Sequence, residues 1–334
     1  MPHLFAYTGR QSADPDCNHV GLFDEWESGT IDSWKDAINI LADISSKNPD
    51  RRFVWRGVND ATFGLYSSLF RRIAEDSSPD TKFCPSEEHL QEAERRILDM
   101  ARTSWRLDMA ALPLFAHLQH YGAPTRLIDV TTSAYIGLFF ACLGRERHHG
   151  RIFGFGADTR DLTLSNDRGN WHISPNIPWE SDTEFGNTWR SEPPLIYYPP
   201  RFPDNDRPWA QHSAFLLGGT PSIDGGSGSL IRYRDQTRVP VRQIMQTTSI
   251  CVKMVGEPHS KKIKNSNPFP TFTYRISPDG KKDILKHLER DLDISASRIY
   301  PDMAGRAQSI ADDPHIFDDV FDQTWLTTPT DPTN

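Results

Sequence analysis

Residues 118–141, LQHYGAPTRLIDVTTSAYIGLFFA, contain the pattern from which the fold is predicted. A helical stretch stops at residues 121–124, YGAP, because glycine and proline interrupt a helix. The apolar run RLIDV, residues 126–130, then predicts a strand. Thr132 or Ser133 can cap the apolar helix that follows. A helix, a strand and a second helix are therefore expected in close succession.

The flanking sequence repeats this mixture of short strands and separate helices. A strand is predicted at RRFVWRGV, residues 51–58, where Gly57, Asn59 and Asp60 end it. Further strands are expected at 151–155, 213–219, 229–234, 248–255 and 270–277, and helices at 33–44, 86–105, 112–120 and 278–292. No GxGxxG or Walker loop follows a strand. The pattern indicates an α+β fold rather than a doubly wound sheet.

The chain is expected to hold one large domain between two less regular ends. Residues 1–32 are polar and predict an irregular lead-in, and residues 33–310 form the domain. Within it, residues 165–209 are rich in proline and tryptophan and are too long for a plain connection, which predicts an ordered insertion or a lid. Residues 311–334 form an acidic tail that can dock on the body or on a partner.

Composition limits the classes of function. With 334 residues, 37% hydrophobic content and a net charge of −8, the chain resembles a globular protein that does not bind nucleic acid by bulk charge. No apolar run could cross a bilayer, and four widely spaced cysteines suit a reducing cytoplasm. Four basic clusters are read as solvated surface charge, although a local basic groove stays open: Arg51–Arg52, Arg71–Arg72, Arg95–Arg96 and Lys261–Lys264.

Several segments resemble one family, the FRG-domain proteins named for a Phe-Arg-Gly motif. They are FVWRGVND (53–60), LYSSLFRR (65–72), residues 118–141 and RPWAQHSAFLL (207–217). Trp55 stands in place of the phenylalanine, and Arg207, Gln211 and Phe215 keep the family's order. The resemblance runs from about Ser33 to Met303, and Tyr300–Asp302 are part of it.

The same residues are similar to the Arg-Ser-Glu pattern of ADP-ribosyltransferases. Arg56 precedes Gly57 at a strand end, and Thr131–Thr132–Ser133 stands where that pattern has Ser-Thr-Ser. The resemblance implies a mixed-sheet core with surrounding helices and an irregular insertion, and NAD as co-substrate. The late-strand glutamate is missing: Gln211 stands at its place, and Asp129 is the nearest charged substitute. The implied catalytic residues are Arg56, Thr132, Gln211 and Asp129.

A nucleotide pocket explains these residue types. The Arg56 guanidinium offers bidentate donors for phosphate or ribose oxygens, and Gly57 lets a ligand approach the backbone. The hydroxyls of Thr131, Thr132 and Ser133 brace a helix start that can accept an oxyanion. Each feature also has a structural interpretation, since arginines form surface ion pairs and hydroxyls cap helices.

Three further residues are candidates for the same pocket. Tyr66 and Tyr121 can stack on nicotinamide or adenine, or simply pack. Arg126 is a second phosphate ligand or an ion-pair partner of Asp129, with the ion pair favoured. His117 and His120 stand three apart on a helix, but no third ligand is near in sequence, so no metal is expected.

The sequence therefore predicts a cytoplasmic mono-ADP-ribosyltransferase. The resemblance suggests a toxin or anti-phage effector held in check by an antitoxin or other inhibitory protein. The alternative is a non-catalytic NAD-binding module that recruits partners through its tail. Single-stranded RNA is narrowly favoured as acceptor over DNA and protein, because four tryptophans could form a wall for an unstacked base: Trp171, Trp179, Trp189 and Trp209.

Overall fold

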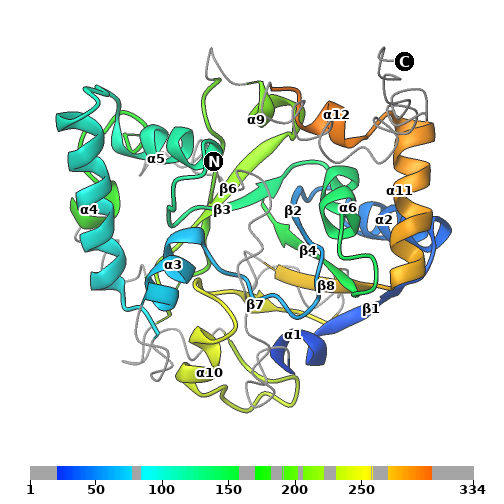
Figure 1. Ribbon diagram of the computed structural model, residues 1–334. Helices are drawn as coiled ribbons and strands as arrows, with labels where there is room; N and C mark the ends of the chain where they lie inside the picture. The colour runs from blue at the N-terminus through cyan, green and yellow to red at the C-terminus, as the bar shows by residue number, and fades with distance from the viewer. Residues whose placement is uncertain are drawn as a thin grey trace, which may run out of the picture.

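The structure is a computed structural model that describes residues 21–76, 84–157, 170–181, 190, 192–201, 206–221, 231–256, 258 and 270–302. Figure 1 shows a central sheet with helices at both of its sides. The expected acidic tail, Trp189 and the lysine cluster at 261–264 lie outside the described residues.

The described strands form one mixed sheet. They are β1 Glu27–Ile31, β2 Phe53–Val58, β3 Ile128–Thr131, β4 Gly150–Gly156, β5 Leu195–Tyr197, β6 Ser213–Leu217, β7 Lys253–Met254 and β8 Pro270–Ile276. The order across the eight-stranded sheet is β1-β8-β4-β2-β3-β6-β5, and β7 also pairs with β8. β1 and β7 run parallel to β8, while the other neighbours are antiparallel. The predicted α+β class is confirmed.

Helices surround this sheet, and three of the longer ones begin at serine caps. They are α1 Gly21–Glu25, α2 Trp34–Lys47, α3 Ser68–Asp76, α4 Glu87–Thr103, α5 Ala111–His120, α6 Ala134–Cys142, α7 Pro178–Ser181, α9 Arg207–Ala210, α10 Val241–Met245, α11 Pro278–Leu292 and α12 Ala296–Ile299. The hydroxyls of Ser33, Ser133 and Ser277 accept backbone N–H groups of α2, α6 and α11. No helix within the described ranges is long and apolar enough to cross a membrane.

The two faces of the sheet are covered differently. One face has a single apolar cluster that extends from Val54 and Phe153 to Ile196. The other face has two clusters. α2, α6 and α11 cover β2, β4 and β8, whereas α4 and α5 cover β5 and β6. Figure 1 shows α4 and α5 on one side of the molecule and α2 and α11 on the other. The two helical layers therefore cover different halves of this face, and Asp129 of β3 stays exposed.

The expected irregular lead-in is wrong for residues 21–31, which form α1 and β1. Buried Arg151 fastens this segment, because its guanidinium contacts Asp24 and lies 3.3 Å from the Glu27 carboxylate. Arg275 donates to the same carboxylates at 2.6 and 2.9 Å. These charges pair only in the folded chain, so local polarity concealed an edge strand.

The expected insertion at 165–209 contributes to the core where it is described. Trp171 and Trp179 are buried in the cluster under α4 and α5. Trp209 is 72% exposed. The idea of a tryptophan wall for an unstacked base is therefore wrong for Trp171 and Trp179, whose rings pack against the domain.

Candidate functional site

Strands β2 and β3 separate soon after they meet. Of the described residues, only Trp55 and Thr131 pair these two strands. By contrast, β3 pairs with β6 along its whole length. Beyond the Trp55 pair, Arg56 Nη1 donates to the Asp129 carbonyl oxygen at 2.6 Å. A side chain thus replaces a backbone donor at this carbonyl, and the sheet opens between its two halves.

Arg56 is a half-buried arginine at this opening. Its side chain follows the face of Val54 and Val58, because alternate residues of a strand share a face. Burial lowers the pKa of Arg56, while Asp129 opposes the shift. The Arg56 Nε is buried and has no hydrogen-bond partner among the described residues. Buried donors are rarely left unpaired, so this nitrogen calls for a ligand or a water molecule as acceptor.

Asp129 presents an exposed carboxylate on the other face of the sheet. It lies opposite Phe215 of β6, on the side that α5 covers. Gln119 Nε2 of α5 donates to Asp129 Oδ1 at 2.8 Å. The Thr125 hydroxyl donates to Gln119 Oε1, which turns the amide so that its N–H faces the carboxylate. A fixed, solvent-facing negative charge results.

Two groups with shifted pKa values share the environment of Asp129. Burial lowers the pKa of His120 to about 4, against the opposing effect of Asp129. Burial also raises the pKa of Tyr300. Arg207 influences both, lies 5.2 Å from the Tyr300 ring centroid and forms a bidentate pair with Asp302 at 2.7 and 2.9 Å. At neutral pH the carboxylate therefore has an uncharged imidazole and an uncharged phenol in its surroundings.

The Thr131–Ser133 element mainly connects the end of β3 to the segment before β6 and to the start of α6. Thr131 Oγ1 donates to the Gln211 carbonyl oxygen at 2.7 Å, and Ser133 caps α6. The Gln211 amide donates to the Ile299 carbonyl oxygen at 3.2 Å. Thr132 is exposed, and its N–H donates to His212. Of the three hydroxyls, that of Thr132 is the most open to a ligand.

Gly57 serves helix packing rather than ligand approach. A Cβ at this position would lie 2.0 Å from the Gly137 carbonyl oxygen and 2.4 Å from the Ala141 nitrogen, both in α6. The expectation that Gly57 contacts the ligand is therefore wrong: the space beside it is filled by helix backbone.

The two candidate tyrosines differ in exposure. Tyr66 stacks on Phe70 with ring centroids 5.5 Å apart, and its hydroxyl donates to the Gln246 carbonyl oxygen. These contacts give Tyr66 a packing role, and its assignment to the pocket stays a prediction. Tyr121 is 54% exposed beside His117. It remains a candidate for stacking.

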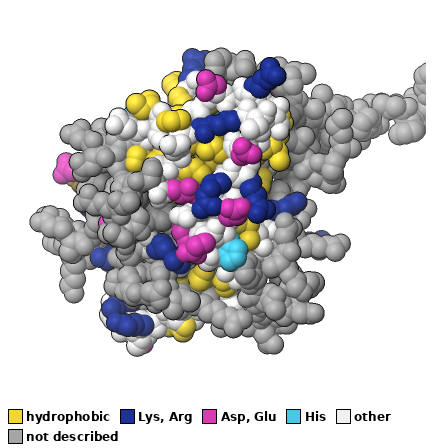
Figure 2. Space-filling model, turned by 90° about the vertical axis from the view of Figure 1, so that its left-hand side faces the viewer, with side chains coloured by type: hydrophobic (Ala, Val, Ile, Leu, Met, Phe, Trp, Pro, Cys, Tyr) yellow, Lys and Arg dark blue, Asp and Glu magenta, His cyan; other side chains and the backbone are white. Residues whose placement is uncertain are grey.

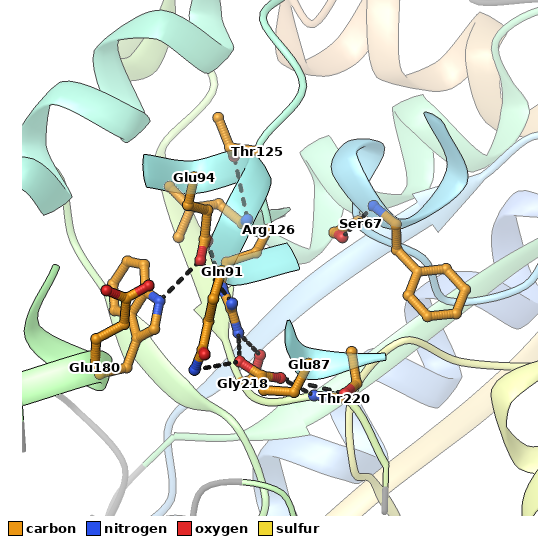
Figure 3. Close-up of polar contacts among 12 residues, drawn as sticks. Ser67, Glu87, Gln91, Glu94, Thr125, Arg126, Glu180, Gly218 and Thr220 are labelled. Carbon is orange, nitrogen blue, oxygen red and sulfur yellow. Dashed lines mark hydrogen bonds and ion pairs between the residues drawn. The ribbon is translucent and has the colours of Figure 1, made fainter. Parts of the chain in front are cut away.

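Arg126 is a buried structural arginine, as Figure 3 shows. It contacts Glu94 at 2.5 and 2.6 Å and Glu87 at 2.7 Å. Although burial alone would lower its pKa, the two carboxylates raise it. Thr220 and the Trp179 indole donate to the same carboxylates. The phosphate-ligand assignment is wrong, and the ion pair is with Glu87 and Glu94 rather than with Asp129.

The basic cluster Arg95–Arg96 lies on a face of mixed charge. Arg95 contacts Glu92 at 2.6 Å and Glu180 at 3.2 Å, and Arg96 contacts Glu92 at 2.8 Å. Figure 2, which faces the α4 side of the molecule, shows basic and acidic side chains interspersed. This cluster is not a basic track for nucleic acid.

Sequence reasoning did not assign five residues to the site: Gln119, His120, Arg207, Tyr300 and Asp302. His120 was considered only as a metal ligand, and Gln119 stood beside it without a role. The other three belonged to segments that resembled the family, and the Arg207–Asp302 pair now joins them. Within the described residues, no group of three or more His, Cys, Asp or Glu side chains could hold a metal ion.

The protein is therefore of the α+β class. Its mixed sheet opens between β2, which carries Arg56, and β3, which carries Asp129. Residues 51–150 match the family model of the FRG domain, so this part of the chain is an FRG domain. No curated protein and no solved structure matches the chain. The matched region contributes β2 and β3, whereas most other strands lie outside it.

Proposed function

We propose that this chain is an NAD-dependent mono-ADP-ribosyltransferase. The observation that carries the proposal is the opening between β2 and β3, where Arg56 donates to the backbone of Asp129 at 2.6 Å. The resemblance places an arginine, a hydroxyl element and an acid on three strands. Here the corresponding strands β2, β3 and β6 are neighbours. That adjacency supports a pocket at the opening of the sheet, which the Arg56 guanidinium and the Asp129 carboxylate would reach from opposite faces.

The chemistry requires a phosphate ligand and a negative charge near the reacting sugar. Arg56 retains its unpaired Nε as a donor for a phosphate or ribose oxygen. When the bond between the sugar C1′ and nicotinamide breaks, the base leaves neutral with the bonding electrons and the sugar becomes cationic. The exposed Asp129 carboxylate would stabilise that cation, and Tyr121 offers an open ring for stacking.

An acceptor oxygen or nitrogen then bonds to C1′ and gives up its proton. His120 is neutral at pH 7, because burial lowers its pKa to about 4. The imidazole is therefore able to receive a proton, though it is a weak base. Asp129 takes the role that a late-strand glutamate has in the related pattern, since the Gln211 amide already donates to Ile299.

The biological role rests on the resemblance, whereas the preference for an RNA acceptor rests on the four tryptophans. Burial of Trp171 and Trp179 removes the main reason for preferring single-stranded RNA over protein. NAD with a tagged adenine, incubated with whole-cell lysate, separates the two by protease and nuclease treatment of the label. A toxin or anti-phage role, with an inhibitory partner, remains part of the proposal.

One observation favours the alternative, an NAD-binding module without turnover. The Gln211 amide is engaged in the fold, and the late-strand position carries no acid. If Asp129 does not replace that acid, NAD would bind without losing nicotinamide. The two functions therefore differ in what Asp129 does.

The test is nicotinamide release from NAD by the Asp129→Asn variant. The carboxamide keeps the shape and loses the charge, so we expect turnover to fall about 100-fold while NAD affinity changes little. Asp108→Asn, at an exposed position next to α5, is the matched control and should keep full turnover. NAD binding by the wild-type chain without nicotinamide release would establish the alternative.

A further inference from the structure

A pocket of about 680 Å³ lies where β2 begins and β3 has ended. Its walls come from α2, the first residues of β2, the start of α6 and the segment after β5. They are Leu41, Ile44, Ser45, Arg51, Arg52, Phe53, Trp55, Thr132, Ala134, Tyr135 and Tyr198. Of the residues assigned to the reaction above, this lining includes only Thr132. The volume is within the usual range for small-molecule sites.

The charge of this pocket selects an anion. Arg51 and Arg52 are the ionised side chains of the lining, which contains no carboxylate. Arg52 is exposed and Arg51 is half-buried. The start of α6 adds partial positive charge, because the first N–H groups of a helix have no intrahelical acceptor. Arginine forks bind phosphate bidentately.

The uncharged part of the lining selects a flat ring. Phe53, Tyr135 and Tyr198 are partly exposed aromatic residues, and Trp55 lies behind them. Aromatic side chains at a binding surface stack on bases, because every base has a π-face. The hydroxyls of Ser45 and Thr132 can form hydrogen bonds with a ribose or base edge.

We propose that this pocket binds a nucleotide unit, a planar base joined to a phosphate, at a site separate from Arg56 and Asp129. Neither Arg56 nor Asp129 is among the residues that line the pocket. The arginines and the rings line one cavity, so a ligand that carries both chemical groups fits it. The site does not depend on the transfer reaction proposed above.

The experiment titrates the full chain with adenosine monophosphate that carries a fluorescent label on the ribose. Arg52→Ala and Tyr135→Ala should each weaken binding about tenfold, because one removes a phosphate ligand and the other a stacking face. Both positions are exposed, and an unchanged Tm shows that each variant folds. Arg96→Ala and Trp105→Ala, at exposed positions on and beside α4, are matched controls and should bind normally. Adenosine and ribose 5-phosphate should each compete weakly.

Two arms identify the source of the nucleotide. Displacement of the probe by short single-stranded RNA at lower concentration than by adenosine monophosphate indicates a strand, and the reverse order indicates a free nucleotide. Either order supports the pocket. Absence of saturable binding, or unchanged binding in both variants, overturns it. Loss of probe binding in Arg56→Lys would show that the probe binds at the Arg56 site, and the proposal of a separate pocket would then be wrong. Nicotinamide release tests the transferase proposal independently.

Discussion

Arg126 and Arg56 are two buried or half-buried arginines close to the same strand, and their surroundings are opposite. Arg126 precedes β3, and two carboxylates surround its guanidinium at 2.5–2.7 Å. Arg56 lies in β2, donates to one backbone carbonyl and has a buried Nε without a partner among the described residues. The protein itself supplies the hydrogen-bond partners of the Arg126 guanidinium, whereas the Arg56 guanidinium keeps one donor without a partner among the described residues.

This difference separates a structural arginine from a candidate ligand-binding one. A buried charge is tolerated when its partners satisfy it, and removing one partner leaves the others uncompensated. An unpaired buried donor costs free energy unless a ligand or water completes it. We therefore expect substitutions near Arg126 to change stability and substitutions near Arg56 to change NAD chemistry.

The largest effect is expected for Arg126→Met. The variant leaves Glu87 and Glu94 buried without their cation, which should lower the free energy of unfolding by about 3–5 kcal/mol. Urea unfolding measures this change. Arg96→Met, at an arginine 77% exposed on α4, is the control and should shift stability by less than about 0.5 kcal/mol.

Removing the charges of Glu87 and Glu94 tests whether uncompensated charge causes the loss of stability in Arg126→Met. Adding Glu87→Gln and Glu94→Gln to Arg126→Met removes the uncompensated charges, so part of the lost stability should return. A triple variant that is less stable than Arg126→Met would show that packing of the side chain over Trp179, 5.2 Å away, matters more than charge.

The next effect is expected for Arg56→Lys. A lysine keeps the charge but cannot supply a planar fork, so nicotinamide release should fall about 100-fold, nearly as far as in Arg56→Ala. Stability should change far less than in Arg126→Met, because within the described part of the chain Arg56 donates to one backbone carbonyl and has no carboxylate partner. Turnover like that of the wild type would show that Arg56 does not bind NAD and that, like Arg126, it has only a structural role.

A third effect should appear on lowering the pH. The pKa of His120 is lowered from 6.5 to about 4, chiefly by burial. Between these values the unfolded chain binds a proton that the folded chain excludes, so stability falls as the pH falls. The loss from this group between pH 7 and pH 5 is about 2 kcal/mol. His120→Gln should show a smaller loss, and an unchanged slope would contradict the assignment to His120.

Much of the fold near these arginines was predictable, because local patterns decide it. Ser33 and Ser133 are helix caps as expected, and the strand around Arg56 lies where its β-branched and aromatic residues predicted it. The strand expected at 248–255 is confirmed only at Lys253–Met254. Residues before it bond to the segment at Leu65–Ser67 instead, since Ser249 accepts the Ser67 N–H at 2.9 Å.

The site was predicted only in part, because residue type does not reveal the neighbours. Arg56 donates to the backbone carbonyl of Asp129, but the two side chains lie on opposite faces of the sheet, so the shared site stays a prediction. For Arg126 the sequence favours an ion pair with the wrong partner, Asp129, because the two glutamates that surround it lie more than 30 residues earlier in the chain. The packing role of Gly57 was not predictable for the same reason. Its close neighbour is the backbone of α6, and the spacing of residues in the sequence does not reveal that contact.

The smallest effect is expected for Gln211→Ala, and it tests which of the two kinds of residue Gln211 is. Its amide donates to the Ile299 carbonyl oxygen at 3.2 Å, next to Tyr300. Losing this bond should cost about 1 kcal/mol of unfolding free energy. If Gln211 also contacts the sugar as its charge develops, turnover should fall more than NAD affinity does. Isothermal titration and nicotinamide release on one sample measure both. Equal losses in binding and turnover would place Gln211 with Arg126 among the structural residues. A larger loss in turnover would place it with Arg56.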